Sequence, residues 1–170
     1  MAMDSAGAVL GMLAMGLLIS VVAPLLVLAG RRRGTDTPGR RPGLAVVILL
    51  GVGVLHAAVV LGPMDDGPVG EVASHALLLA SGIAFWLPVL GRGTTRLPDA
   101  GRSVYLFLAC PYLDMAALAL VVRGEELAGI AMIVGMLPIP LAAVVLTWRW
   151  IAGEERSAQA LDGATLGRTP

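Results

Sequence analysis

The sequence has little charge and no lysine. Asp, Glu, Lys and Arg make up 14% of its 170 residues, and all twelve basic residues are arginine, balanced by twelve acidic residues. A soluble domain usually has about a quarter of its residues charged, whereas 57% of this chain is hydrophobic. This composition excludes a water-soluble enzyme domain and a disordered chain. The net charge of zero excludes a nucleic-acid binder that relies on positive charge.

Cysteine and catalytic motifs are also scarce. Cys110 is the only cysteine, which excludes an internal disulfide framework and a cysteine-based zinc site. The sequence contains no HExxH motif, no GxGxxG motif, no phosphate-binding loop and no Ser/His/Asp or Cys/His arrangement. We therefore expect this protein not to be an enzyme.

Long apolar stretches are the dominant feature that is present. About 20 apolar residues cross a bilayer as a helix, and five stretches approach or exceed that length: residues 6–30, 44–62, 72–91, 103–122 and 127–151. Helices are expected because backbone polar groups in lipid must pair internally. The sequence predicts an all-α, polytopic transmembrane bundle formed by a single domain (1–152), followed by a short, polar and disordered cytoplasmic tail (153–170).

The arginines predict the orientation of the bundle. Eleven of the twelve lie in the loops 31–43 and 92–102 or at and beyond the end of the fifth span, and only Arg123 lies on the other side. Cytoplasmic loops carry the excess of arginine and lysine. The N-terminus is therefore predicted outside and the C-terminus in the cytoplasm, with the first stretch retained as a span because no basic residue precedes it.

Both histidines and several methionines fall in the predicted outer half of the membrane, about 5 to 14 Å below its outer edge. Imidazole and thioether together favour Cu(I). The candidate copper ligands are His56, His75, Met12 and Met132, with Met136 as an alternate. Two plainer interpretations stay open: methionine is a common filler of apolar helices, and His75 lies close enough to the interface to bond a carbonyl or a lipid headgroup.

Two further residues inside the fourth span have open roles. A carboxylate at the depth of Asp114 is costly, so Asp114 either bonds Tyr112 or a helix backbone, or marks a path for protons or metal. Cys110 is expected to be a small packing residue. Four prolines are expected to kink their helices: Pro88, Pro111, Pro138 and Pro140. A small permease is disfavoured, since the sequence indicates neither a broken helix pair nor an inverted repeat.

Three segments resemble a known family. They read HALLLASGIAFWLPVLG (75–91), VAPLLVLAG (22–30) and EELAGIAM (125–132), the last followed by TWRW (147–150). Together they resemble the CtaG family of cytochrome c oxidase assembly factors. The resemblance implies a multi-pass protein of the bacterial plasma membrane that supplies copper to oxidase subunits, with His56 and His75 at two of the family's histidine positions.

The chain also departs from that family. Family members usually have seven spans, and the first two are not found here. The family's H-x-x-Q-H pattern falls on Met12, Met15 and Gly16. The leading hypothesis is a copper-binding assembly factor for cytochrome c oxidase. The alternative is a structural or accessory subunit of a respiratory membrane complex that binds no metal.

Overall fold

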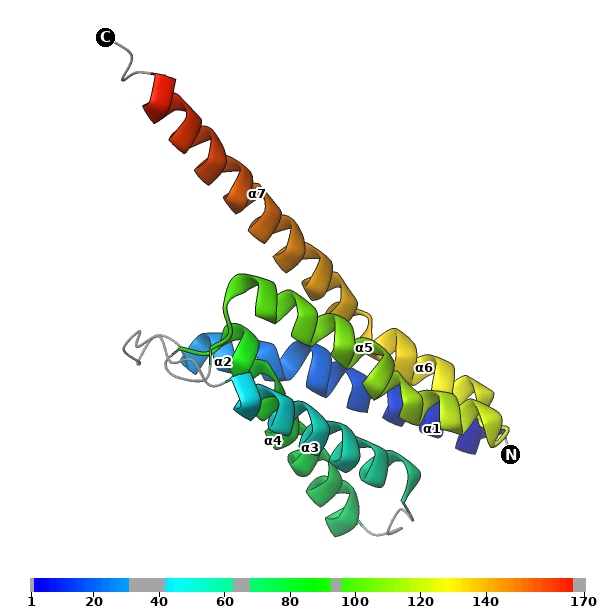
Figure 1. Ribbon diagram of the computed structural model, residues 1–170. Helices are drawn as coiled ribbons and strands as arrows, with labels where there is room; N and C mark the ends of the chain where they lie inside the picture. Colours follow the sequence, from blue (N-terminus) through cyan, green and yellow to red (C-terminus); the bar gives the residue numbers. More distant parts are fainter. Residues whose placement is uncertain (1, 31–41, 63–67, 93–95, 167–170) are drawn as a thin grey trace.

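The computed structural model describes residues 2–30, 42–62, 68–92 and 96–166, and its elements are all helical (Figure 1). In chain order they are α1 (Ala2–Leu17), the π-helix η1 (Leu18–Val22), α2 (Ala23–Gly30), α3 (Pro42–Leu61), α4 (Pro68–Leu90), α5 (Asp99–Val122), α6 (Glu126–Met136) and α7 (Pro138–Leu166). The α1–η1–α2 series and the α6–α7 pair each form one predicted span, so the eight helices make five spans.

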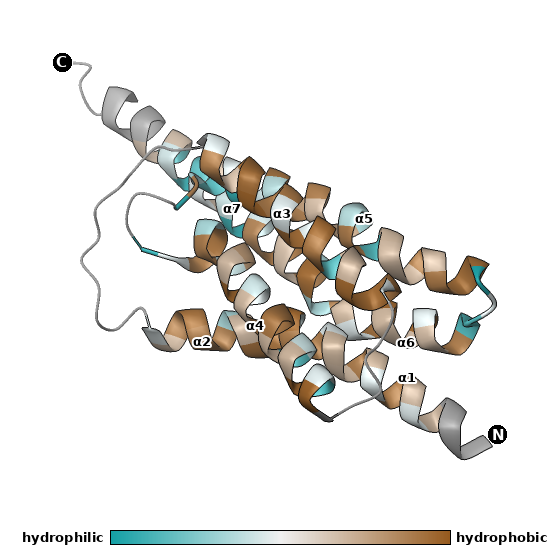
Figure 2. Ribbon diagram, turned by 90° about the horizontal axis from the view of Figure 1, so that it is seen from below, coloured by the Kyte–Doolittle hydropathy of each residue, from teal (hydrophilic) through white to brown (hydrophobic). Residues whose placement is uncertain are grey.

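Five helical stretches are long and apolar enough to cross a membrane, which confirms the all-α, five-span prediction. They are Ala6–Gly30, Gly43–Leu61, Val69–Leu90, Asp99–Val122 and Glu126–Ala160. Hydrophobic residues lie all around these helices, while hydrophilic ones gather at the helix ends, for example at the turn between α5 and α6 (Figure 2). Large apolar side chains such as Leu25, Val54 and Val144 are more than half exposed, as expected for surfaces that face lipid.

The orientation of the bundle stays a prediction. Residues 31–41, which carry five of the arginines that predict the orientation, lie outside the described residues, as does the acidic segment Met64-Asp65-Asp66 of the predicted outer side. We refer below to the end of the bundle that carries Leu61 and the α5–α6 turn as the predicted outer end.

The prediction that the tail is disordered from residue 153 onward is wrong as far as Leu166, because α7 continues without a break to that residue. Nine of the 14 residues from 153 to 166 are alanine, glutamate, arginine, glutamine or leucine, which are strong helix formers. Adding residues to an existing helix also avoids the cost of nucleating a new one. The Arg156 side chain further donates to the carbonyl of Ala152, one turn back.

A π-helical turn interrupts the first span, and Pro24 explains it. The amide of Ala23 donates to the carbonyl of Leu18, five residues back. The carbonyl of Ile19 therefore loses its α-helical donor, Ala23, and its π-helical donor would be Pro24, which has no N–H. The indole Nε1 of Trp86 donates to this carbonyl at 2.8 Å. One side chain of α4 thus satisfies the acceptor that the proline leaves open.

The fifth span is interrupted at Leu137. The Leu137 amide donates to the carbonyl of Val134, three residues back, and α7 then begins at Pro138. The kink expected at Pro138 and Pro140 is therefore present. The sequence did not locate this interruption, because short 3₁₀ turns and prolines divide a helix without interrupting its apolar run.

The two interrupted spans pack against each other at glycines. A Cβ added to Gly135 of α6 would lie 2.8 Å from the Leu13 carbonyl and 3.2 Å from the Gly16 Cα of α1. Only glycine allows the two backbones to approach this closely. The hydroxyl of Ser20 in η1 donates to the Gly135 carbonyl at 2.6 Å. The α1–α6 contact is thus both tightly packed and hydrogen-bonded.

Helix α5 lies at the centre of the second group of contacts. It packs against α3, α6 and α7, and its turn into α6 is short because Gly124 adopts a positive φ of 88°. Two bonds fix its register with α3: Tyr112 donates to the Leu50 carbonyl, and Arg123 to the Leu61 carbonyl. Helices α3 and α5 therefore run parallel.

Candidate functional site

His56 is the least satisfied polar residue among those the structure describes in the spans. It is fully buried in α3, at 0% exposure, and neither ring nitrogen has a hydrogen-bond partner. A buried polar group without a partner costs about 1–3 kcal/mol, and such groups in native proteins are usually paired. An imidazole without a partner in the chain is suited to bind a ligand that the chain does not itself supply.

The position of His56 follows from the register between α3 and α5. Leu50 meets Tyr112, and Leu61 meets Arg123, so by the same offset His56 lies near the level of Leu118 of α5. Helix α3 also packs against α4. The ring of His56 is therefore enclosed within the α3–α4–α5 group, toward the predicted outer end.

His75 lies at a similar level on α4. Counted from the α3–α4 turn, His56 is about 8 Å and His75 about 10 Å down the helices. The Nδ1 atom of His75 lies 2.8 Å from the Glu71 carbonyl, and since a carbonyl only accepts, Nδ1 donates and Nε2 is left as the acceptor. Histidine ligands of metals commonly donate their second ring N–H to a backbone carbonyl in this way.

The predicted sulfur ligands belong to a different helix pair. Met12 of α1 and Met132 of α6 are buried, at 6% and 0% exposure, and so is the alternate ligand Met136, at 3%. Helices α1 and α6 pack directly together. The structure thus places Met12 and Met132 on one pair of packed helices, α1 and α6, and the two histidines on another, α3 and α4, with η1 in contact with both α4 and α6.

No three His, Cys, Asp or Glu side chains in the described part of the chain form a metal-binding group. Thioethers are not among those residue types. The predicted copper site therefore depends on imidazole nitrogens and methionine sulfurs together.

Comparison with known proteins identifies no relative: no protein-family model matches the chain, and neither a curated protein nor a solved structure does. The resemblance to the CtaG family stays a prediction. Any function must be argued from the residues themselves.

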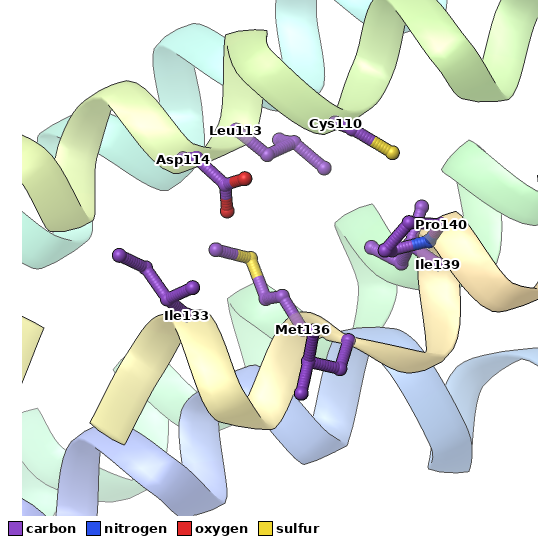
Figure 3. Close-up of a pocket in the computed structure, with 8 residues that line it drawn as sticks. Cys110, Leu113, Asp114, Ile133, Met136, Ile139 and Pro140 are labelled. Atoms are coloured by element: carbon purple, nitrogen blue, oxygen red, sulfur yellow. The ribbon is translucent and has the colours of Figure 1, made fainter. Parts of the chain in front are cut away.

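The structure shows the partners and surroundings of the polar residues in the fourth span. Tyr112 donates its hydroxyl to Leu50, so it is not the partner of Asp114. Cys110 donates its thiol to the carbonyl of Leu106, 3.1 Å away, and is half-buried. Asp114 instead lines a cavity between α5 and the α6–α7 break, which sequence reasoning missed (Figure 3). Pro138 and Pro140 were the signal that could have indicated it.

Proposed function

We propose that this protein is an integral membrane protein that binds copper and assists assembly of the copper centres of cytochrome c oxidase. The observation that carries the proposal is the fully buried His56, whose two ring nitrogens have no partner. Neutral imidazole is the commonest protein ligand for transition metals. A bound copper ion would supply the interaction that the helices do not.

The neighbouring residues support copper over other metals. His75 presents Nε2 as a free acceptor while its Nδ1 is held by Glu71, and it lies on the helix that packs against that of His56. Buried thioethers at Met12 and Met132 are soft donors that suit Cu(I). Met136 is the alternate sulfur ligand. We propose that copper binds at the histidines and exchanges with these sulfurs.

Copper stoichiometry tests the proposal. Protein purified in detergent and loaded under reducing conditions is expected to retain about one copper per chain, and the double variant His56→Ala/His75→Ala is expected to retain none. The Cys110→Ala variant is the control, since a lone thiol also binds Cu(I), and it should keep its copper. Equal copper content in the double variant and the unaltered protein would refute the assignment.

A stability measurement gives an independent check on His56. Replacing His56 by leucine removes two unsatisfied polar atoms from an apolar interior, so the metal-free variant is expected to be more stable by about 1 kcal/mol. His75→Leu is the matched control and should show no gain, because its Nδ1 already has a partner. The effect of each of the two variants is measured as its free energy of unfolding in detergent without metal. A less stable His56→Leu variant would mean that the imidazole already has a partner in the protein.

The second candidate is an accessory subunit of a respiratory membrane complex. It becomes the better proposal if the unaltered protein retains no copper but co-purifies with oxidase subunits. The five apolar helices are equally suited to that role.

A further inference from the structure

A cavity lies where the fifth span is interrupted. It is lined by Cys110, Leu113 and Asp114 of α5 and by Ile133, Met136, Leu137, Ile139 and Pro140 around the break, and it measures about 30 Å³. A cavity needs only about 10–15 Å³ on this measure to hold a water molecule. The space is thus sufficient for a small ion with a water molecule.

The break leaves carbonyl groups without their helical donors. Pro140 has no N–H to donate to the Met136 carbonyl, and the Leu137 amide donates to Val134 rather than to Ile133. Ile133 and Met136 both line the cavity. They belong to the last turn of α6, whose carbonyl groups give the helix terminus a partial negative charge.

Asp114 adds a carboxyl group to the same place. Its carboxylate points into the space between α5 and α6, toward the end of the Met136 side chain (Figure 3). It forms no hydrogen bond or ion pair with any residue in the described ranges. A carboxylate within a span is costly and is normally paired, and no arginine lines this cavity.

We propose that this cavity binds one sodium ion, held by the Asp114 carboxylate and the released carbonyls of Ile133 and Met136. Oxygen donors favour hard cations, and a single carboxylate matches a single positive charge. Divalent cations take more oxygen ligands and more carboxylates. Carbonyl groups and helix ends at breaks in transmembrane helices are a recurring way of binding Na⁺.

Soft metal ions fit the cavity less well. The thiol of Cys110 points away from Asp114 (Figure 3) and donates to the Leu106 carbonyl. The two sulfurs and the carboxylate therefore do not converge on one point. The sodium site shares only the alternate sulfur ligand, Met136, with the proposed copper site, and neither His56 nor His75 lines the cavity.

Equilibrium binding of radioactive ²²Na⁺ to the purified full chain tests the proposal. We expect about one Na⁺ per chain, displaced by unlabelled Na⁺ but not by an equal excess of K⁺. The Asp114→Asn variant, close in shape but uncharged, should bind Na⁺ at least about tenfold more weakly. Glu126→Gln, which neutralises an exposed carboxylate, is the matched control and should bind normally.

A second measurement keeps the proposal testable if Asp114→Asn does not fold. The melting temperature of the unaltered protein should be higher in sodium chloride than in choline chloride at equal ionic strength, because a bound ion stabilises the folded state. Absence of Na⁺ binding, equal binding by Asp114→Asn, or equal melting temperatures in the two salts would each overturn the sodium site. The His56→Ala/His75→Ala variant should bind Na⁺ normally, so failure of the copper proposal leaves this one standing.

Discussion

Truncating Trp86 to alanine is expected to lower the free energy of unfolding by about 3–5 kcal/mol, the range for large aromatic side chains in a core. The indole is 2% exposed and packs edge-on against Phe85, with ring centroids 5.4 Å apart. It also donates the only bond that replaces the two backbone donors lost by Ile19 at the π-helix. The variant therefore leaves a void and an unsatisfied carbonyl together.

Unfolding by sodium dodecyl sulfate in mixed micelles measures this loss. The Trp86→Phe variant separates the loss of packing from the loss of the hydrogen bond, because phenylalanine keeps an aromatic ring but has no donor. We expect this variant to lower the free energy of unfolding by about 1–3 kcal/mol. A Trp86→Ala variant within about 1 kcal/mol of the unaltered protein would contradict the expectation. So would equal losses in the two variants.

Replacing Gly135 by leucine is expected to cost about 3 kcal/mol, at the upper end of the usual range for overpacking. The nearest atoms to an added Cβ are backbone atoms of α1, the Leu13 carbonyl oxygen and the Gly16 Cα. Backbone cannot turn aside as a flexible side chain can, so α1 and α6 must separate. Their separation also pulls the Gly135 carbonyl from the Ser20 hydroxyl.

Gly11→Leu is the matched control for this substitution. Gly11 lies on α1, the other helix of the pair, but a Cβ there meets no atom within 4 Å, so its unfolding free energy should stay close to that of the unaltered protein. Ser20→Ala should destabilise the unaltered protein but add little to Gly135→Leu, since the bond is already lost. Additive losses would show that the helices had not moved apart.

The sequence was sufficient to locate the spans because their boundaries depend on local composition. Apolar length and the flanking polar residues placed the first span at 6–30 and the fourth at 103–122, close to the observed Ala6–Gly30 and Asp99–Val122. The end of α7 was misjudged for a related reason. Polarity marks where a helix leaves the apolar phase, but it does not mark where the helix itself ends, which propensity decides.

The interruptions within spans were harder to predict. Pro138 and Pro140 indicated a kink, but the sequence does not show which amide donates to which carbonyl at the break, nor that a cavity lies there beside Asp114. The carbonyl that the π-helix η1 leaves open is satisfied by Trp86, more than 60 residues from Pro24 along the chain. The sequence pattern around Pro24 does not indicate such a hydrogen-bond partner, because only tertiary packing brings it close.

The candidate ligands show the same limit. Counting residues from helix ends gives depth along the membrane normal, and it placed His56, His75, Met12 and Met132 in one layer. It does not give the position of a helix around the bundle. The structure places the histidines on α3 and α4 and the sulfurs on α1 and α6, a division that depends on which helices pack together.

The length of α7 has a mechanical consequence. This helix has 29 residues, which makes it a rod about 43 Å long at 1.5 Å per residue, and it extends beyond the other helices (Figure 1). One end of the rod is the break at Leu137, beside the cavity, and the other is Leu166. A tilt of about 5° at the break displaces the far end by about 4 Å. By its length alone, α7 has the geometry of a lever arm, in which a small rotation at the break would be amplified at the far end.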